Sequence, residues 1–314
     1  MRQDDTVTKF RPLRDQVLNG NSSGTMPNKL PVRYLAALAL LVFMVNAFSV
    51  AANAAEIKIA SWNIYWLTAE DPDHHRRKAG DYTRLAGYAS NLDADVIALQ
   101  EVDAGFVRKV FPLQQYRIEL SHREDTRQRT GFAIRRGIRY RRLPDYRELS
   151  TNWGLRYGTV IELEVGGRKI DVMSVHLKSG CFDRDLDRPG TRSCRELKSQ
   201  VRPLESWIDR RLERGRAFIL LGDFNRRMDR RRDDLWRFIA DGNPKPIYRV
   251  NAGEKPRCWG SRFPEFIDHI VVGPIAGKAV KPHSFEELTY TETNYYRWRK
   301  RLSDHCPISI RLVF

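Results

Sequence analysis

The sequence has few cysteines and no long apolar run, and each of these shortages disfavours a class of site or protein. Cysteine occurs only 4 times in 314 residues, and no two cysteines have the Cys-x-x-Cys spacing of a structural zinc site. Apolar residues nowhere continue for the roughly 20 positions that a membrane-spanning helix needs, which disfavours a spanning segment. There is also no internal repeat and no heptad pattern, so we expect a monomer without an obligate protein partner.

Acidic residues are scarce relative to basic ones. The chain has 39 Asp and Glu against 55 Lys and Arg, which gives a net charge of +16 and a pI of about 9.9. Such a balance favours acidic partners, namely nucleic acid, phosphate esters or anionic membrane surfaces, although a well-solvated basic surface would have the same composition. The 41% of hydrophobic residues are enough for one large core.

The first 54 residues have the pattern of a targeting segment. Lys29 and Arg33 precede an apolar run from Tyr34 to Val45, and an Ala-Asn-Ala site ends at Ala54. A positive flank, a short apolar stretch and small residues at its end are typical of a secretory signal peptide. We therefore expect cleavage after Ala54 and export to the periplasm or the medium, with an uncleaved membrane anchor as the alternative.

Residues 1–25 are polar and rich in Asn, Ser and Gly, which is unusual in front of a signal peptide. Our hypothesis is that Met26 is the true start of translation. Residues 55–314 contain no linker and are expected to form one catalytic domain.

All four cysteines lie in the predicted mature chain, and export permits disulfides. Four cysteines allow three pairings. We favour Cys181–Cys194, because both lie in one polar loop that a disulfide would close, and Cys258–Cys306 then follows by default.

Strand-like and helix-like segments alternate from residue 56 onward. Apolar residues at helical spacing lie at 84–92 and 197–208. Strand candidates lie at 57–62, 96–99, 131–135, 158–165, 169–176, 217–222, 267–272 and 307–313. Many strands with few helices predict an α/β fold in which two β-sheets pack face to face with helices outside them.

Polar residues occur where these strands begin or end, and they carry the functional signal. Each has an ordinary structural interpretation when taken singly, as a turn residue, a solvated strand end or a core histidine. Together they supply oxygen ligands, amides and imidazoles paired with carboxylates, which metal-assisted hydrolysis requires. The residues are Asn63, Glu101, His176, Asp223, Asn225, Asp268, Asp304 and His305.

The segments around these residues resemble the successive motifs of the endonuclease/exonuclease/phosphatase superfamily. All six motifs occur in the family's order and span residues 61–307. They are Ser61-Trp62-Asn63-Ile64, Leu99-Gln100-Glu101, Ser174-Val175-His176-Leu177, Gly222-Asp223-Phe224-Asn225, Ile267-Asp268-His269-Ile270 and Ser303-Asp304-His305-Cys306-Pro307. The resemblance implies the deoxyribonuclease I-like fold, a four-layer sandwich of two mixed sheets flanked by helices.

The same resemblance implies a metal site. Glu101 would be the main Mg²⁺ ligand with Asn63 beside it, and Mn²⁺ is a possible substitute. Asp304 would bind a metal-bound water or a second ion.

The resemblance also implies the catalytic roles. His305 would be the general base toward the attacking water, or would polarise the phosphate, and Asp268 would orient it. Asp223 and Asn225 would position the nucleophile and contact a phosphate oxygen, while His176 would donate to the phosphate in the transition state.

Arginines in several loops suggest a polyanionic substrate. Arg226 directly follows the Asp223–Asn225 motif, and Arg156 with Tyr157 forms an aromatic-basic cluster, so we expect these three residues to contact substrate. An exported nuclease fits this pattern best. The alternatives are a hydrolase of phospholipids or small phosphate esters, and a catalytically silent binding domain.

Overall fold

A computed structural model describes residues 55–68 and 77–314. The predicted signal peptide, its cleavage site after Ala54 and the Met26 start lie outside these residues. One compact unit, Asn53–Phe314, contains all of them. Among the described residues, no helix has both the length and the apolar character needed to cross a membrane.

Two six-stranded mixed sheets form the centre of the structure. The first has the order β11-β12-β1-β2-β4-β3, and only β1 and β2 are parallel neighbours. Its strands are β1 (Glu56–Leu67), β2 (Val96–Val102), β3 (Tyr116–Leu120), β4 (Arg129–Arg135), β11 (Glu286–Glu287) and β12 (Ile308–Val313).

The second sheet has the order β5-β6-β7-β8-β10-β9, and its one parallel pair is β7 with β8. Its strands are β5 (Arg139–Arg142), β6 (Thr159–Val165), β7 (Arg168–His176), β8 (Ala217–Asp223), β9 (Tyr248–Arg249) and β10 (Asp268–Val272).

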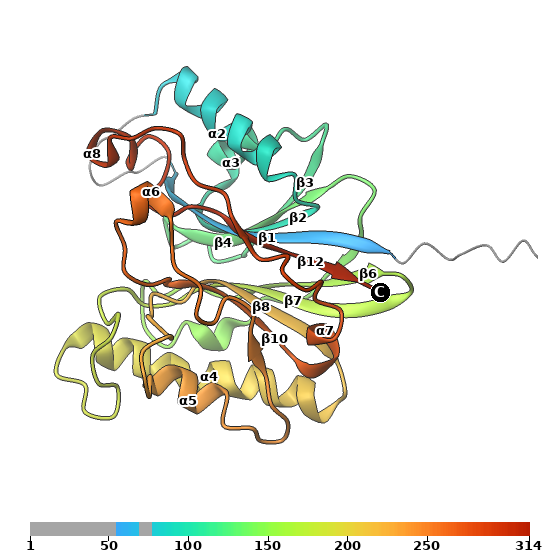
Figure 1. The fold of residues 1–314 in the computed structure, drawn as a ribbon, viewed down its shortest axis with the longest axis vertical. Helices are drawn as coiled ribbons and strands as arrows, with labels where there is room; N and C mark the ends of the chain where they lie inside the picture. Colours follow the sequence, from blue (N-terminus) through green and yellow to red (C-terminus); the bar gives the residue numbers. More distant parts are fainter. Residues whose placement is uncertain (1–54, 69–76) are drawn as a thin grey trace, which may run out of the picture. The chain divides into compact units, whose positions relative to one another are not determined.

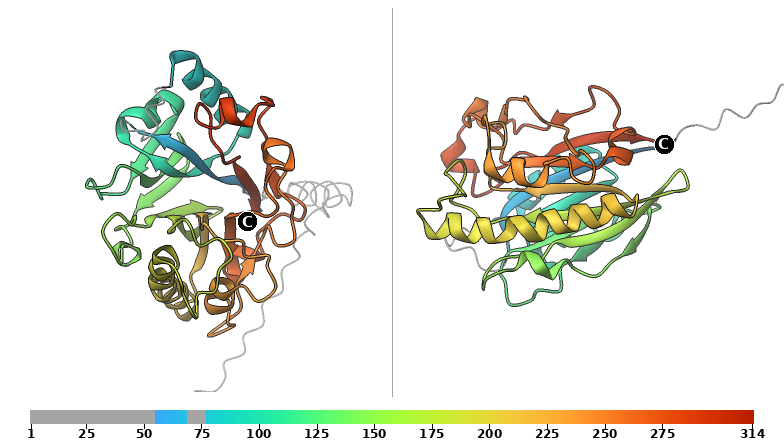
Figure 2. Two further views of the ribbon diagram at one scale, coloured as in Figure 1. Left: turned by 90° about the vertical axis from the view of Figure 1, so that its left-hand side faces the viewer. Right: turned by 90° about the horizontal axis from the view of Figure 1, so that it is seen from below.

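Helices cover the outer face of each sheet, as Figures 1 and 2 show. Helices α2 (Ala79–Leu92) and α3 (Ala104–Val110) pack on the first sheet, and α4 (Arg192–Glu213) and α5 (Asp234–Ile239) pack on the second. The remaining helices are short segments in the loops: η1 (Arg147–Leu149), α6 (Cys258–Ser261), α7 (Pro274–Gly277) and α8 (Tyr295–Trp298). The predicted four-layer sandwich is therefore confirmed.

The apolar patterning of strand β8 explains the layering. All seven residues of β8 are buried. Phe218 and Leu220 belong to the core under α4, whereas Ile219 and Leu221 belong to the core between the sheets. A strand that contacts apolar layers on both faces must be continuously hydrophobic, as this one is.

The predicted segments appear with small shifts, and the short elements were not predicted. Helix α2 begins at Ala79 rather than at 84, because the Lys78 N–H donates to the Asp81 carboxylate and the Asp81 N–H donates to the Lys78 carbonyl, which closes the first turn. The edge strand β5 has the sequence Arg-Tyr-Arg-Arg, with no apolar alternation to reveal it.

Both expected disulfides are present. Cys181–Cys194 joins the loop after β7 to the first turn of α4, with a Cα–Cα distance of 5.0 Å. Cys258–Cys306 joins α6 to the segment before β12, with a Cα–Cα distance of 5.7 Å.

Candidate active site

Polar side chains lie together at the ends of three neighbouring strands of the second sheet. His176 and Asp223 end the parallel strands β7 and β8 and are register partners. Asp268 begins the antiparallel strand β10 and is the register partner of Asp223 on its other side. Asp223 therefore lies between a histidine and a second carboxylate.

The first sheet contributes the residues that face these strand ends. The Nδ2 of Asn63 donates to Asp223 Oδ2 at 3.0 Å and to Glu101 Oε1 at 3.3 Å. His176 Nε2 lies 3.6 Å from Asp223 Oδ2 and 3.8 Å from Glu101 Oε1. The two sheets thus meet in one polar cluster.

The cluster forms one wall of a cavity of about 480 Å³, a volume typical of ligand-binding sites. Seven of the predicted catalytic and metal-binding residues line it, and the eighth, Asn63, is hydrogen-bonded to two of them. The lining residues are Glu101, His176, Asp223, Asn225, Asp268, Asp304 and His305.

Two of these residues have a left-handed backbone conformation, which sets the direction of their side chains. Glu101 has a φ of 61° and lies where the β2–β4 register shifts between Leu99 and Val102. Asn225 has a φ of 52°. Bulges and left-handed conformations cost free energy and are concentrated at functional sites. At Gly222, a Cβ would lie 2.0 Å from the carbonyl oxygen of Val175, so only glycine fits.

The imidazole of His305 is held by a carboxylate. Its Nδ1 lies 2.7 Å from Asp268 Oδ2, and its Nε2 lies 3.8 Å from Asp223 Oδ2 and 4.0 Å from Asp304 Oδ1. Burial alone would lower the pKa of His305. The negative charges of the surrounding carboxylates have the larger combined effect, with Asp268 contributing most, and they raise that pKa well above 6.5.

The pKa values of the neighbouring groups are shifted in different directions. Burial raises the pKa of Asp223 to about 7, against the opposing effect of His305. Burial also raises the pKa of Glu101, and the charge of Asp304 adds to this. Burial and the nearby Arg156 guanidinium lower the pKa of His176 well below 6.5. Because groups with perturbed pKa values are concentrated at catalytic sites, this cavity is the candidate active site.

The donor set fits a hard divalent cation. Asn63 Oδ1 and Asp304 Oδ1 are buried acceptors without a hydrogen-bond partner, and Glu101 supplies a carboxylate beside Asn63. Unpartnered buried oxygens are costly unless a cation or water contacts them. Ligand atoms of Asp223, Asp268 and His305 also lie within 4.8 Å of one another, but Asp268 and His305 are already hydrogen-bonded to each other.

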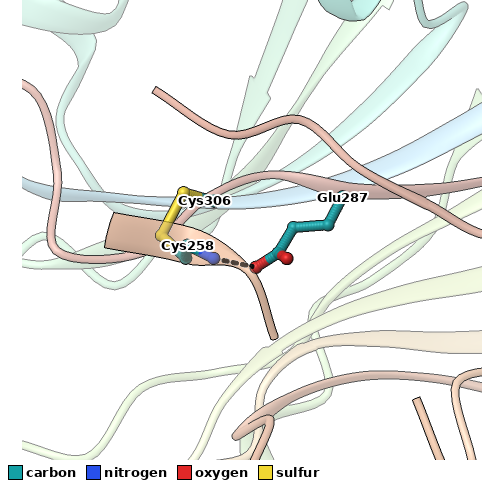
Figure 3. Close-up of side chains that lie close together, drawn as sticks. All are labelled: Cys258, Glu287 and Cys306. Carbon is teal, nitrogen blue, oxygen red and sulfur yellow. Dashed lines mark hydrogen bonds between the residues drawn. A yellow bond between two sulfur atoms is a disulfide. The ribbon is translucent and has the colours of Figure 1, made fainter. Parts of the chain in front are cut away.

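A second group of potential ligands is not a metal site. Cys258, Glu287 and Cys306 lie close together, but the disulfide leaves no thiolate to bind a metal (Figure 3). The Glu287 carboxylate instead accepts hydrogen bonds from the backbone N–H groups of Arg257 and Cys258.

The predicted substrate contacts are found in different environments. Arg156 lines the cavity, donates to the Leu177 carbonyl at 3.0 Å and has a buried Nε without a partner. Tyr157 is partly buried beneath the guanidinium groups of Arg123 and Arg147, and it does not line the cavity.

Arg226, the third predicted substrate contact, lies inside the protein and does not line the cavity. Its side chain is buried, pairs with Asp233 at 2.5 Å and donates to the carbonyls of Cys181 and Arg184. In this arrangement the guanidinium joins three loop segments inside the protein. Sequence adjacency to Asn225 gave no information on the direction of the side chain.

Several supporting residues were missed. Tyr290 accepts from Trp62 Nε1 at 3.0 Å and donates to the His305 carbonyl at 2.8 Å. Ser303 donates to the Asn63 carbonyl and accepts from the His305 N–H. Ser303 precedes Asp304-His305 in its motif, which was a usable signal, whereas Tyr290 lies in a loop without any pattern.

The sequence profile of the Endonuclease/Exonuclease/phosphatase family matches residues 60–305. No curated protein sequence is significantly similar.

Solved structures share the fold at low sequence identity. TDP2 from C. elegans matches 97% of this chain and 99% of its own, with 18% identity and a TM-score of 0.58. A family protein from Bacteroides thetaiotaomicron matches 83% and 98%, with 18% identity and a TM-score of 0.55. D. rerio TDP2 in complex with a single-strand DNA product matches 82% and 98%, with 17% identity and a TM-score of 0.55. The profile match and the fold agree, and the chain belongs to the Endonuclease/Exonuclease/phosphatase family.

Proposed function

We propose that the protein is an exported, Mg²⁺-dependent phosphodiester hydrolase that acts on nucleic acid. Members of its family are phosphoric ester hydrolases, nucleases among them. The observation that carries the proposal is the cavity in which the Asp268–His305 pair faces Asp223, Glu101 and Asp304. Such a site combines proton transfer with the oxygen ligands of a cation.

Glu101 and Asn63 would hold the metal, with Asp304 nearby to bind one of its waters. A bound Mg²⁺ would supply positive charge against the scissile phosphate and its leaving oxygen. The unpartnered oxygens of Asn63 and Asp304 support this assignment.

The side chains of the protein would handle the proton and the phosphate. Asp268 holds His305 through Nδ1, which leaves Nε2 as the atom that exchanges a proton with the attacking water. Asp223 accepts from the backbone N–H of Asn225 at 2.7 Å, so its carboxylate is fixed for orienting that water. His176 and Arg156 would donate to phosphate oxygens as negative charge develops.

Nucleic acid is the substrate that fits the charge best. The chain carries a net charge of +16, and Arg156 lines the cavity. Phosphodiester backbones attract such surfaces without sequence readout. Among the structural neighbours, D. rerio TDP2 was solved with a single-strand DNA product, and the TRAS1 domain is described as an endonuclease.

A substrate panel tests the function. The full chain is produced and assayed on plasmid DNA, single-stranded oligonucleotides, bis-p-nitrophenyl phosphate and sphingomyelin, in EDTA and in Mg²⁺ or Mn²⁺. We expect nucleic acid cleavage that EDTA abolishes and either metal restores. Hydrolysis of the lipid or the small ester without cleavage of nucleic acid would favour the alternative substrates, and binding without turnover would favour a silent domain.

Export is tested separately by fractionating cells that express the chain from Met1. We expect a product in the periplasm or the medium whose N-terminal residue is Ala55. A product that keeps residues 1–54 would contradict the cleavage site. N-terminal sequencing of a natural precursor that begins before Met26 would contradict the proposed start.

A further inference from the structure

The cavity extends well beyond the catalytic residues. A second part of its wall is apolar and aromatic and comes from the chain before β10, which includes α6, from α8 and from the segment before β12. The lining residues of this part are Pro256, Cys258, Phe263, Phe266, Tyr295 and Cys306. Phosphate hydrolysis itself does not require these side chains. They are therefore candidates to contact the part of the substrate that is attached to the phosphate.

Aromatic and arginine side chains continue outward from this wall. The Arg262 guanidinium carbon lies 4.4 Å from the ring centroid of Tyr295 and 4.8 Å from that of Tyr296. The ring centroid of Tyr295 lies 5.9 Å from that of Phe263 and 5.4 Å from that of Tyr296, and Arg299 also packs over Tyr295. We call Arg262, Phe263, Tyr295, Tyr296 and Arg299 the aromatic–arginine platform.

The platform is open to ligands. Tyr296 is 71% exposed, and Arg262 is exposed as well. Exposed aromatic groups beside a cavity are common in binding sites.

The charge of the platform is not neutralised. Within residues 55–68 and 77–314, no carboxylate forms an ion pair with Arg262, Arg297 or Arg299, and all three contact aromatic rings instead. Arg227, which lines the cavity, differs because it pairs with Asp183 at 2.9 Å. The positive charge of the platform arginines Arg262 and Arg299 is therefore available to a ligand.

We propose that the platform binds an unpaired stretch of nucleic acid next to the scissile phosphate, which makes single strands or unpaired ends the preferred substrate. The proposal rests on the proposed function. Rings and guanidinium planes stack on the faces of unstacked bases, which a duplex does not expose, and free arginines neutralise the phosphates between them. Phe263 and Tyr295 line the same cavity as His305, so a base on the platform is adjacent to the phosphate at the catalytic residues.

Binding and cleavage by platform variants test the proposal. Tyr296→Ala and Arg262→Ala are compared with the unmodified full chain by fluorescence anisotropy in EDTA, with a labelled oligothymidylate and a hairpin duplex of equal charge. We expect roughly tenfold weaker single-strand binding and unchanged duplex binding, because one base loses its stacking partner. For Arg262→Ala, the slope of log affinity against log salt should fall by about 0.7, because one phosphate contact is lost.

Two further variants distinguish the loss of base stacking from nonspecific effects of a substitution. Tyr296→Phe keeps the ring but loses the 2.6 Å hydrogen bond from Arg262, and should keep most of the single-strand affinity. Tyr248→Ala removes another exposed tyrosine, on strand β9 away from the platform, and should leave both affinities unchanged. In Mg²⁺, the ratio of kcat/KM for single-stranded over duplex substrate should fall only in the Tyr296→Ala and Arg262→Ala variants.

The proposal is overturned if platform variants weaken single-strand and duplex binding equally, or weaken neither. It is also overturned if they lose affinity for sphingomyelin–phosphatidylcholine vesicles while oligonucleotide affinity is unchanged, because the platform would then be a membrane surface. Absence of hydrolysis of every ester by the unmodified chain would refute the proposed function instead, and the anisotropy comparison would still decide whether the platform binds single strands.

Discussion

The Nδ1 of His305 lies 2.7 Å from the Oδ2 of Asp268, although 37 residues separate them. Asp268 begins β10 in the second sheet, and His305 precedes β12 in the first. Their pairing therefore depends on how the two sheets pack. It fixes which ring nitrogen of His305 is directed at Asp223 and the cavity.

Asp268→Asn should lower kcat by about 10³-fold, because an amide neither stabilises the imidazolium nor enforces its orientation as a carboxylate does. His305→Ala should cause a loss at least as large. If Asp268 acts through His305, the double variant should lose no more than His305→Ala alone. Steady-state kinetics on a verified substrate measure all three, and additive losses would show that Asp268 acts independently.

Glu101→Gln should abolish most activity while the fold persists. Burial and Asp304 raise the pKa of Glu101, so the ionised carboxylate is unfavourable in the metal-free protein. Gln keeps an oxygen that can accept from the Trp66 N–H, now 2.9 Å from Oε2, and removes the buried charge. We expect a Tm at neutral pH equal to or above that of the unmodified protein in EDTA. A preserved rate would remove Glu101 from the mechanism.

His269 should make stability depend on pH. Burial, followed by the charge of Arg249, lowers its pKa to about 3. Its Nε2 contacts the Arg226 carbonyl at 2.8 Å, and its Nδ1 faces the Asn251 amide at 3.3 Å, so the neutral ring fits. Because the folded pKa is below the unfolded value of 6.5, the unfolded state binds a proton first, and stability is lost as the pH falls from about 6.5 toward 3.

Urea unfolding of the unmodified protein and of His269→Gln at pH 7 and pH 4.5 measures this effect. The unmodified protein should lose roughly 2–3 kcal/mol more free energy of unfolding between these pH values than the variant does. The difference between the two proteins isolates His269 from other titrating groups. Identical losses would show that His269 does not carry this dependence.

The two disulfides should differ in their contribution to stability. Cys258–Cys306 closes a loop with a sequence separation of 48, and Cys181–Cys194 one of 13. Loop-closure entropy predicts about 4 kcal/mol for the longer loop and about 3 kcal/mol for the shorter one. Cys306 also directly follows His305, so replacing Cys258 and Cys306 by Ser should lower activity as well.

Denaturant unfolding and turnover of the two double-serine variants check this ranking, with each variant serving as the other's control. Larger losses of both stability and activity on replacing Cys181 and Cys194 would contradict it.

The sequence predicted the sheet framework because its signals are local. Residues such as Phe218, Ile219, Leu220 and Leu221 form a short continuous apolar run, as a strand buried on both faces requires. The motif order then gave the residues at the strand ends, and parallel or antiparallel pairing brought His176, Asp223 and Asp268 together.

The remaining features depend on contacts between distant segments. The direction of the Arg226 side chain is decided by Asp233 and by two carbonyls of the loop after β7. Tyr290 links His305 to Trp62, which is 228 residues away from Tyr290 in the sequence. No periodicity or spacing within either segment carries this information, and the platform around Arg262 was missed for the same reason.

The most direct test of the metal site is an anomalous difference map from a crystal of the protein soaked in Mn²⁺. We predict a peak about 2.0–2.4 Å from a Glu101 carboxylate oxygen and beside Asn63 Oδ1, inside the cavity that His305 lines. Mn²⁺ bound only elsewhere, for example at the exposed group of Asp185, Asp187 and Asp234, with no peak at Glu101 would contradict it.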